Sequence, residues 1–144
     1  MSTLRWIVLA AALIVCWIGL KPHFSAPPLA QQDISALTAA PVVARYLQQH
    51  QQLPAFYLTK SQARRQGWDP AKGNLCVSLP GHAIGGDRFA NREGRLPAAA
   101  GERFFEADVN YQCGHRNADR LIWSTTGTVW LTRDHYRTFT RMPW

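Results

Sequence analysis

Three short stretches in the last third of the chain, each with a two-residue hydrophobic period, restrict the fold more than any other feature. In FFEADVNY, which starts at Phe104, apolar side chains alternate with polar or charged ones. DRLIWS and TVWLT repeat the pattern, and turn-forming segments at 114–117 and 125–127 separate the stretches. A two-residue period gathers apolar side chains on one face of a strand. We therefore expect half-buried antiparallel strands, with RTFTR forming the last.

The region before these strands has a helical period instead. In PVVARYLQQH, the spacing of apolar residues and the proline at the start predict a helix that ends at Leu53-Pro54. A short polar helix is expected at 61–66, and 69–86 is expected to be mostly loop. The expected class is therefore α+β, with N-terminal helices packed on a C-terminal antiparallel β-sheet. The apolar positions of the first helix are Val42, Val43, Tyr46 and Leu47.

The beginning of the chain predicts export. The uncharged run from Trp6 to Leu20 follows Arg5 and is shorter than the roughly 20 residues that cross a bilayer. Its length fits the apolar region of a secretory signal peptide. Prolines beside both candidate cleavage sites, Ala26 and Ala30, keep a retained signal anchor open as the alternative. Residues 1–30 are thus expected to be a signal peptide or signal anchor, and 31–40 a linker or pro-region.

Two cysteines, Cys76 and Cys113, lie beyond this leader. In an exported chain two thiols most often join, and closing a loop of this length contributes roughly 3–5 kcal/mol of stability. The alternative is a pair of buried free thiols. A zinc site is not expected, because neither cysteine belongs to a CxxC pair.

Charged residues gather on one side of the expected sheet. Glu106 and Asp108 share the polar face of one strand, Arg120 lies on the polar face of the next, and Arg116 lies in the connecting turn. Two carboxylates and a guanidinium can therefore meet on an open sheet surface. The alternative is a solvated face with cross-strand ion pairs, worth ~0.2–1 kcal/mol each. His135, just before the last strand, is by itself more typical of a structural or exposed histidine.

The charge balance points to a polyanionic partner. Sixteen Lys and Arg residues against nine Asp and Glu residues give a net charge of +7. For a chain of this size, that excess favours nucleic acid, an acidic membrane or an acidic protein as the partner.

Seven stretches, in order and without an evident gap, carry a family resemblance. They run from about Val43 to Arg141: YLQQHQQLP, YLTKSQARRQGW, KGNL, IGGDRFANREGRLP, EADVNY, RNADR and DHYRTFT. In this register the chain resembles the barnase-like family of microbial guanyl-specific ribonucleases. The resemblance implies a ribonuclease domain over 41–144 with the microbial ribonuclease fold. It also implies cleavage of single-stranded RNA after guanosine through a 2′,3′-cyclic phosphate, with no metal and no cofactor.

The resemblance assigns catalytic roles to five residues. Glu106 of EADVNY matches the general base and His135 of DHYRTF the general acid, which predicts a bell-shaped pH profile in mildly acidic solution. Lys60, Arg116 and Arg120 match the cations around the scissile phosphate, where such donors stabilise charge that builds on its oxygens.

The resemblance places guanine recognition in the loop FANREG. Glu93 matches the carboxylate that accepts hydrogen bonds from N1 and N2 of guanine. The backbone amides of Asn91 and Arg92 are expected to face O6 of the base. Phe89 and Tyr136 are candidates for stacking on single-stranded RNA or, equally, for packing in the core.

Some positions depart from the family pattern. Cys76 and Cys113 stand where the pattern has no cysteine, yet their positions are neighbours in the family fold, which supports a disulfide. Glu102 and Thr126 replace two residues that form an ion pair in the pattern. His115 replaces an aromatic residue beside Arg116, which leaves the preference for the downstream nucleotide open.

The leading expectation is a secreted, monomeric endoribonuclease, periplasmic or membrane-anchored if the leader is retained. Contact with a membrane is expected only through an uncleaved N-terminal segment. An acidic, barstar-like inhibitor would protect the producing cell by complementing Lys60, Arg92, Arg116 and Arg120. One alternative is an interbacterial ribonuclease toxin with a cognate immunity protein. The other is a non-catalytic RNA-binding module, which the presence of both a base and an acid disfavours.

Overall fold

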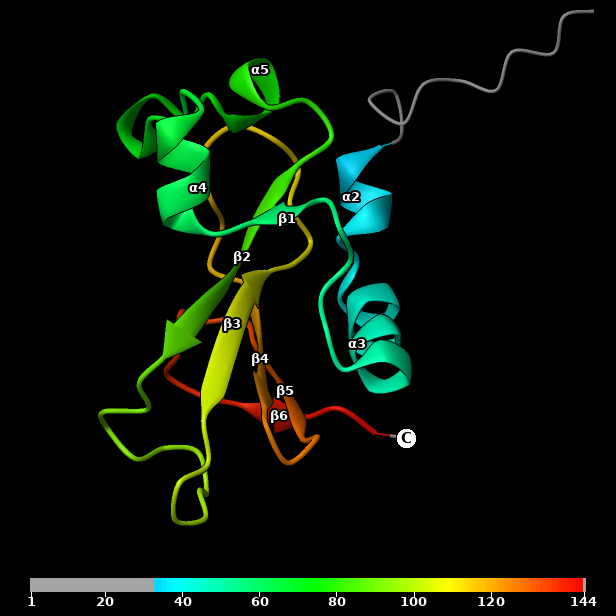
Figure 1. The fold of residues 1–144 in the computed structure, drawn as a ribbon, viewed down its shortest axis with the longest axis vertical. Coiled ribbons are helices and arrows are strands. Elements are labelled where there is room, and N and C mark those ends of the chain that lie inside the picture. The colour runs from blue at the N-terminus through cyan, green and yellow to red at the C-terminus, as the bar shows by residue number, and fades with distance from the viewer. Residues whose placement is uncertain (1–32, 144) are drawn as a thin grey trace, which may run out of the picture.

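In the computed structural model, which describes residues 33–143, six strands form one sheet in the order β1-β2-β3-β4-β5-β6 (Figure 1). β1 and β2 run parallel, and every later neighbour is antiparallel. The expected α+β class with a C-terminal antiparallel sheet is confirmed. The leader expected at 1–30 lies outside the described residues. The strands are β1 (Tyr57–Leu58), β2 (Ala83–Phe89), β3 (Phe104–Asp108), β4 (Arg120–Ser124), β5 (Val129–Thr132) and β6 (Thr140–Arg141).

The helices precede the antiparallel strands. α2 and α3 lie beside the sheet, whereas α4, η2 and α5 belong to the connection from β1 to β2 (Figure 1). Within residues 33–143, no helix is both long and apolar enough to cross a bilayer. The helices are α2 (Ile34–Leu37), α3 (Ala40–His50), α4 (Lys60–Arg65), the 3-10 helix η2 (Pro70–Lys72) and α5 (Leu75–Ser78).

α3 forms where the helical period predicts it, but its buried face includes Ala40 and Ala44 in place of Val42 and Tyr46. Val42, expected on the apolar face, is 55% exposed. The buried residues are instead spaced three and four apart, and two of them are alanines that let the helix backbone approach the sheet closely. The buried positions are Ala40, Val43, Ala44 and Leu47.

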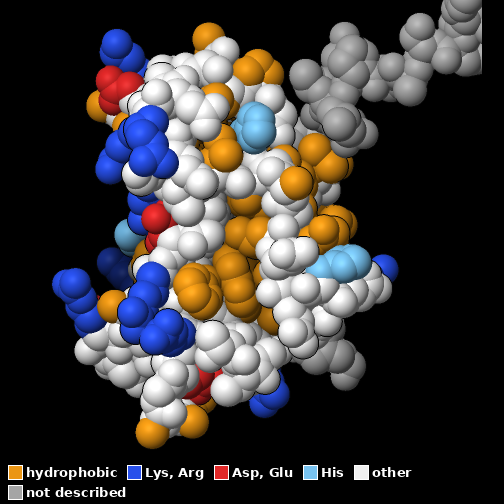
Figure 2. Space-filling model, viewed as in Figure 1, with side chains coloured by type: hydrophobic (Ala, Val, Ile, Leu, Met, Phe, Trp, Pro, Cys, Tyr) orange, Lys and Arg blue, Asp and Glu red, His pale blue; other side chains and the backbone are white. Residues whose placement is uncertain are grey.

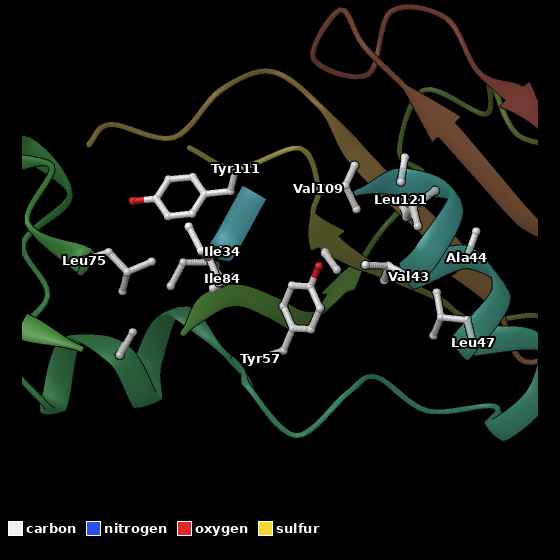
Figure 3. Packing of buried hydrophobic residues seen from close by; sticks show 14 of the residues in the cluster. Ile34, Val43, Ala44, Leu47, Tyr57, Leu75, Ile84, Val109, Tyr111 and Leu121 are labelled. Carbon is white, nitrogen blue, oxygen red and sulfur yellow. The ribbon is translucent and has the colours of Figure 1, made fainter. Parts of the chain in front are cut away.

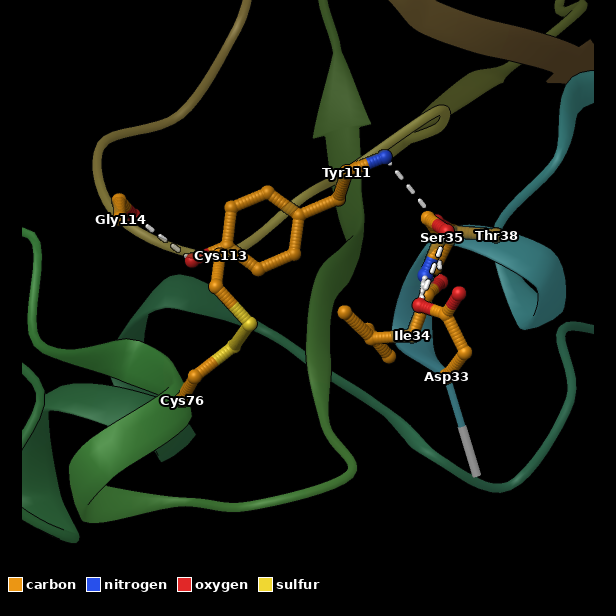
Figure 4. Close-up of a disulfide and its surroundings, with 8 residues drawn as sticks. All are labelled: Asp33, Ile34, Ser35, Thr38, Cys76, Tyr111, Cys113 and Gly114. Atoms are coloured by element: carbon orange, nitrogen blue, oxygen red, sulfur yellow. Dashed lines mark hydrogen bonds between the residues drawn. A yellow bond between two sulfur atoms is a disulfide. The ribbon is translucent and has the colours of Figure 1, made fainter. Parts of the chain in front are cut away.

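The segment expected as a linker is helical from Ile34 to Leu37 and belongs to the folded body. The side chain of Asp33 caps α2 by accepting from the Ser35 amide. Thr38 is fully buried, and its two oxygens accept hydrogen bonds from the backbone amides of Asn110 (2.8 Å) and Tyr111 (3.0 Å). Figure 4 shows the bond from Tyr111 to Thr38. The start of the described chain is therefore tied to the segment after β3.

β2 was not expected, because its two glycines lie in a segment that reads as loop. Gly85 is required by close packing, since a Cβ there would lie 2.6 Å from the Tyr57 ring and 2.8 Å from Cβ of Ala107. Gly86 has φ +103° and stands at the register shift between β2 and β3. The residues that weaken the strand signal are thus the ones that let the strand fit.

Both faces of β3 and β4 are covered. On one face, Ala107, Val109 and Leu121 pack with α2 and α3 in the main core, part of which is drawn in Figure 3. On the other face, Phe104 and Ile122 pack with Leu96 from the loop after β2 and with half-buried side chains from β2, β5 and the loop after β5. The expectation of an open, solvated sheet face is therefore wrong, although the parity of the charged residues is correct.

A disulfide joins Cys76 of α5 to Cys113 in the loop after β3, with a Cα–Cα distance of 5.6 Å (Figure 4). The expected pairing is confirmed, and the alternative of two free thiols is excluded.

The pair of residues that departs from the family ion pair still interacts. The hydroxyl of Thr126 donates to Oε1 of Glu102 at 2.6 Å. This bond, together with one from the Ala99 amide, holds the pKa of Glu102 below its usual value. A hydrogen bond thus replaces the ion pair between these positions.

Candidate active site

The site face of the sheet is the face of β3 turned away from the main core. Glu106 pairs across the sheet with Asp87 of β2, and Asp108 pairs with Arg120 of β4. Glu106 is 7% exposed, and Asp108 and Arg120 are 2% exposed. Charged groups buried to this extent need specific partners, because removing a charge from water is costly.

Both carboxylate oxygens of Glu106 have a donor. Nζ of Lys60 lies 3.1 Å from Oε1, and the hydroxyl of Tyr136 donates to Oε2 at 2.5 Å. Lys60 is the first residue of α4, and its backbone amide donates to Asp87 at 3.0 Å. A capping box formed by Thr59 and Gln62 fixes the same turn. The helix start therefore sets the position of the lysine opposite the carboxylate.

The hydroxyl of Tyr136 remains a donor over the whole ordinary pH range. Burial raises its pKa, and the hydrogen bond to Glu106 and the negative charge of that residue raise it further. The positive charge of Arg120 acts in the opposite direction on the same pKa.

Asp108 organises two guanidinium groups. Nε and Nη2 of Arg116 donate to its two oxygens, both at 2.7 Å, in a bidentate pair. Nε of Arg120 lies 3.0 Å from Oδ1 but is not aligned for a hydrogen bond. Nη1 of Arg120 donates to the backbone oxygens of Asn117 and Asp119. The predicted pairing of Arg120 with Asp108 is present, and Arg116 joins it.

His135 and Tyr136 lie in the β5–β6 loop, residues 133–139, and both have left-handed backbones, with φ of 54° and 70°. His135 is exposed, its ring packs edge-on against Tyr136 at 4.8 Å, and its amide donates to Ala118 in the loop after β3. The loop thus carries the histidine next to the tyrosine that binds Glu106.

Asp134 fixes this loop, a role the sequence analysis missed. Its carboxylate accepts from the amide and hydroxyl of Thr138, the hydroxyl of Thr132 and the amide of Arg137. The bonds from Thr138 contribute most to lowering its pKa to about 2. The sequence contains one sign of this role, an aspartate four residues before a threonine. That pattern is too common to predict a loop of this kind.

A cleft of about 310 Å³ lies between the β2–β3 loop, residues 90–103, and the β5–β6 loop. The rings of Phe89 and Tyr136 stack in it, 5.2 Å apart. The Asn91 side chain makes two hydrogen bonds with the backbone of Leu96, and Asn91 has φ 48°. Its amide side chain therefore holds the loop shape. The cleft is lined by Phe89, Ala90, Asn91, Arg92, Glu93, Arg95, Tyr136 and Phe139.

The structure brings the expected site residues together in two connected groups. One group contains Glu106 with its donors, and Asp108 with Arg116 and Arg120; the other group is the cleft, and Tyr136 belongs to both. His135 packs against Tyr136 at the edge of these groups. Arg95, which no sequence signal singled out, pairs with Glu93 at 2.8 Å. Among residues 33–143, no group of three or more His, Cys, Asp and Glu side chains is placed to hold a metal ion.

The surface is divided by residue type. Figure 2 shows Lys and Arg side chains along the side that carries α4 and β2, and hydrophobic side chains between the strands and α3. A second cleft of about 310 Å³ lies beside α3 and is lined by Leu47, Phe105 and Trp123 among others. It contains none of the expected site residues.

The chain is similar to known ribonucleases. The family described as ribonuclease matches residues 40–143. Ribonucleases of Bacillus intermedius and Bacillus pumilus are each 55% identical over 100 residues, covering 69% of this chain and 62% of theirs. A ribonuclease of Heyndrickxia coagulans is 54% identical over 100 residues, covering 69% of this chain and 92% of its own. The match thus spans less than two thirds of the two Bacillus relatives.

Proposed function

The chain belongs to the ribonuclease family, and we propose that it is an endoribonuclease that cleaves single-stranded RNA after guanosine by metal-independent transesterification. The observation that carries this proposal is the carboxylate of Glu106, buried yet bound by two donors, beside a loop that carries an exposed histidine. A binding module needs no such carboxylate, because burying a charge costs stability unless it serves a purpose.

The reaction begins at the ribose. Glu106 accepts the proton of the 2′-hydroxyl while that oxygen bonds to the adjacent phosphorus. The bond from phosphorus to the 5′-oxygen breaks, and His135 gives its proton to the leaving oxygen. The product is a 2′,3′-cyclic phosphate, which water opens to a 3′-phosphate with the two proton-transfer roles exchanged. DNA does not react, since it has no 2′-hydroxyl.

Three cations stabilise the charge of the phosphate, and they differ in how exposed their side chains are. The side chains of Lys60 and Arg116 are 34% and 24% exposed, so they can reach the equatorial oxygens. Arg120 is 3% exposed and is held by Asp108 and by backbone carbonyls. Its charge acts on the site from within the fold.

Base selection belongs to the cleft. The carboxylate of Glu93 accepts from N1 and N2 of guanine, a donor pair that adenine lacks. The amides of Asn91 and Arg92 face O6, on a loop whose shape the Asn91 side chain holds. The stacked rings of Phe89 and Tyr136 give the base an aromatic wall.

Cleavage of GpN and ApN dinucleotides in EDTA tests this proposal. We expect the wild type to cleave GpN in preference to ApN, and Glu106→Gln and His135→Ala each to lose about 10²–10⁴ of kcat. Thermal unfolding verifies that both variants are folded. RNA binding without cleavage by the wild type would establish the binding module instead, and activity lost in EDTA would contradict the metal-independent mechanism.

Export and an inhibitor belong to the same proposal. We propose residues 1–30 as the export leader, and the disulfide is compatible with an oxidising compartment. An acidic, barstar-like inhibitor would contact Lys60, Arg92 and Arg116, whereas Arg120 is too buried to contribute to that surface. Harmless overexpression of active protein in a host without such an inhibitor would contradict this part.

A further inference from the structure

Arg95 is the one cleft residue whose guanidinium contacts both loops through a single nitrogen. Its Nη1 lies 2.8 Å from Oε2 of Glu93 in the β2–β3 loop. The same nitrogen donates to the backbone oxygen of Tyr136 in the β5–β6 loop at 2.9 Å. The contact with Tyr136 is a hydrogen bond, whereas the contact with Glu93 is a close ion pair.

The second contact extends this link to the general base. Tyr136 accepts from Arg95 through its backbone and donates to Glu106 through its hydroxyl. Four residues therefore form a continuous path from the base-reading carboxylate to the proton-accepting carboxylate. The path crosses between two loops that the chain connects only through three strands of the sheet.

Glu93 needs such an anchor, because its side chain is 68% exposed. A free glutamate on a surface loop samples many rotamers, and fixing it at the moment of binding weakens binding. Arg95 fixes it beforehand. A carboxylate offers about four lone pairs, so one contact at Oε2 leaves acceptor sites for the two guanine donors.

We propose that Arg95 is a positioning residue for guanine selection: it holds Glu93 in the cleft and joins the base-reading loop to the loop of Tyr136 and His135. This inference rests on the proposed function. An ordinary exposed ion pair contributes little to stability. The pair of Arg95 and Glu93 differs because Arg95 also donates to Tyr136 in the other loop and because both residues line the cleft.

Binding of guanosine 3′-monophosphate and adenosine 3′-monophosphate, measured by calorimetry, tests the inference without any need for cleavage. We expect Arg95→Ala to weaken guanylate binding about tenfold and to change adenylate binding by less than about twofold. Arg95→Lys retains the charge and should restore most of the loss. Arg45→Ala removes an equal charge from an exposed position of α3 and should change neither affinity.

The effect of Arg95→Ala is then measured again in a protein that already carries Glu93→Gln. If Arg95 acts through Glu93, adding Arg95→Ala to Glu93→Gln has no further effect on the ratio of the two affinities. An unchanged ratio in Arg95→Ala alone, or an equal loss for both nucleotides, would overturn the inference. A wild type that binds guanylate selectively but cleaves no dinucleotide would refute the proposed function and leave the role of Arg95 measurable.

Discussion

Asp108 has the most demanding environment of any residue in the site. Its side chain is 2% exposed and faces two arginines, one of them equally buried. Removing one partner from a buried pair leaves an uncompensated charge, which typically costs 3–5 kcal/mol. We therefore expect Asp108→Asn to lower the free energy of unfolding by about 3–5 kcal/mol, measured by urea denaturation.

A matched comparison is available in the cleft. Glu93→Gln also neutralises a carboxylate paired with an arginine, but that carboxylate is exposed. The expected loss is below about 1 kcal/mol. Similar losses for both variants would show that Asp108 is not stabilised by its burial among charges.

Asp134 predicts a dependence on pH. Its pKa is lowered from 3.8 to about 2 by hydrogen bonds that only the folded chain makes. A carboxyl whose pKa is lower in the folded chain adds stability at pH values above its unfolded pKa. That stability is lost as the pH falls through its folded pKa. The melting temperature of the wild type should exceed that of Asp134→Asn by a constant amount above about pH 5, and the difference should shrink as pH falls and be lost at about pH 1. An undiminished difference at about pH 1, below both pKa values, would contradict this origin.

At the residue scale, the sequence predicts which face of the sheet a side chain lies on better than it predicts whether that face is buried. The two-residue period correctly placed Glu106, Asp108 and Arg120 on one face. It could not show that this face is covered, because the cover comes from Leu96 and Phe139 in distant loops. The contact of Arg95 with Tyr136 joins residues 41 positions apart, and no local pattern encodes such a contact.

At the scale of elements, the β3–β4 loop, residues 109–119, is held at several points. The disulfide ties it to α5, the ring of His115 hydrogen-bonds the backbone of Ala71 at 3.1 Å, and the hydroxyl of Tyr111 donates to Gly114. These contacts flank Arg116, so they define where its guanidinium can lie.

Replacing both cysteines with serine tests the largest of these constraints. The cysteines are 37 positions apart, and opening a loop of that length should cost about 4 kcal/mol through the entropy of the unfolded chain. Urea denaturation of Cys76→Ser/Cys113→Ser measures the loss, and reduced wild type should match it. A loss below about 1 kcal/mol would show that the native loop is strained by the bond.

The elements themselves were only partly predictable. α3 and α4 were expected because each has a helical period or a clear stop, whereas β2 was missed because tertiary contacts, not local preference, require Gly85. α2 was missed because four residues with one apolar anchor are too few to show a period.

At the scale of the whole molecule, the net charge of +7 predicts salt-sensitive turnover of RNA. Each cation that neutralises a phosphate on a single strand contributes about −0.7 to the slope of log affinity against log salt. Arg92 is exposed and lines the cleft, so we expect its side chain to neutralise one phosphate of a bound strand, and Arg92→Ala should make the slope of log kcat/KM for oligonucleotides shallower by about 0.7. Arg45→Ala, which removes a charge from α3, should not change it; an equal change in both would mean that only total charge matters.

The hydrogen bonds of Thr38 limit how far the chain can be shortened from its N-terminus. Asp33 caps α2, and Thr38 satisfies the amides of two residues that follow β3. A maturation peptidase acting at Ala26 or Ala30 would leave this junction intact. Expression that starts at Pro41 would remove Thr38 and leave buried amides without acceptors, so the shortest stable chain should begin at or before Asp33.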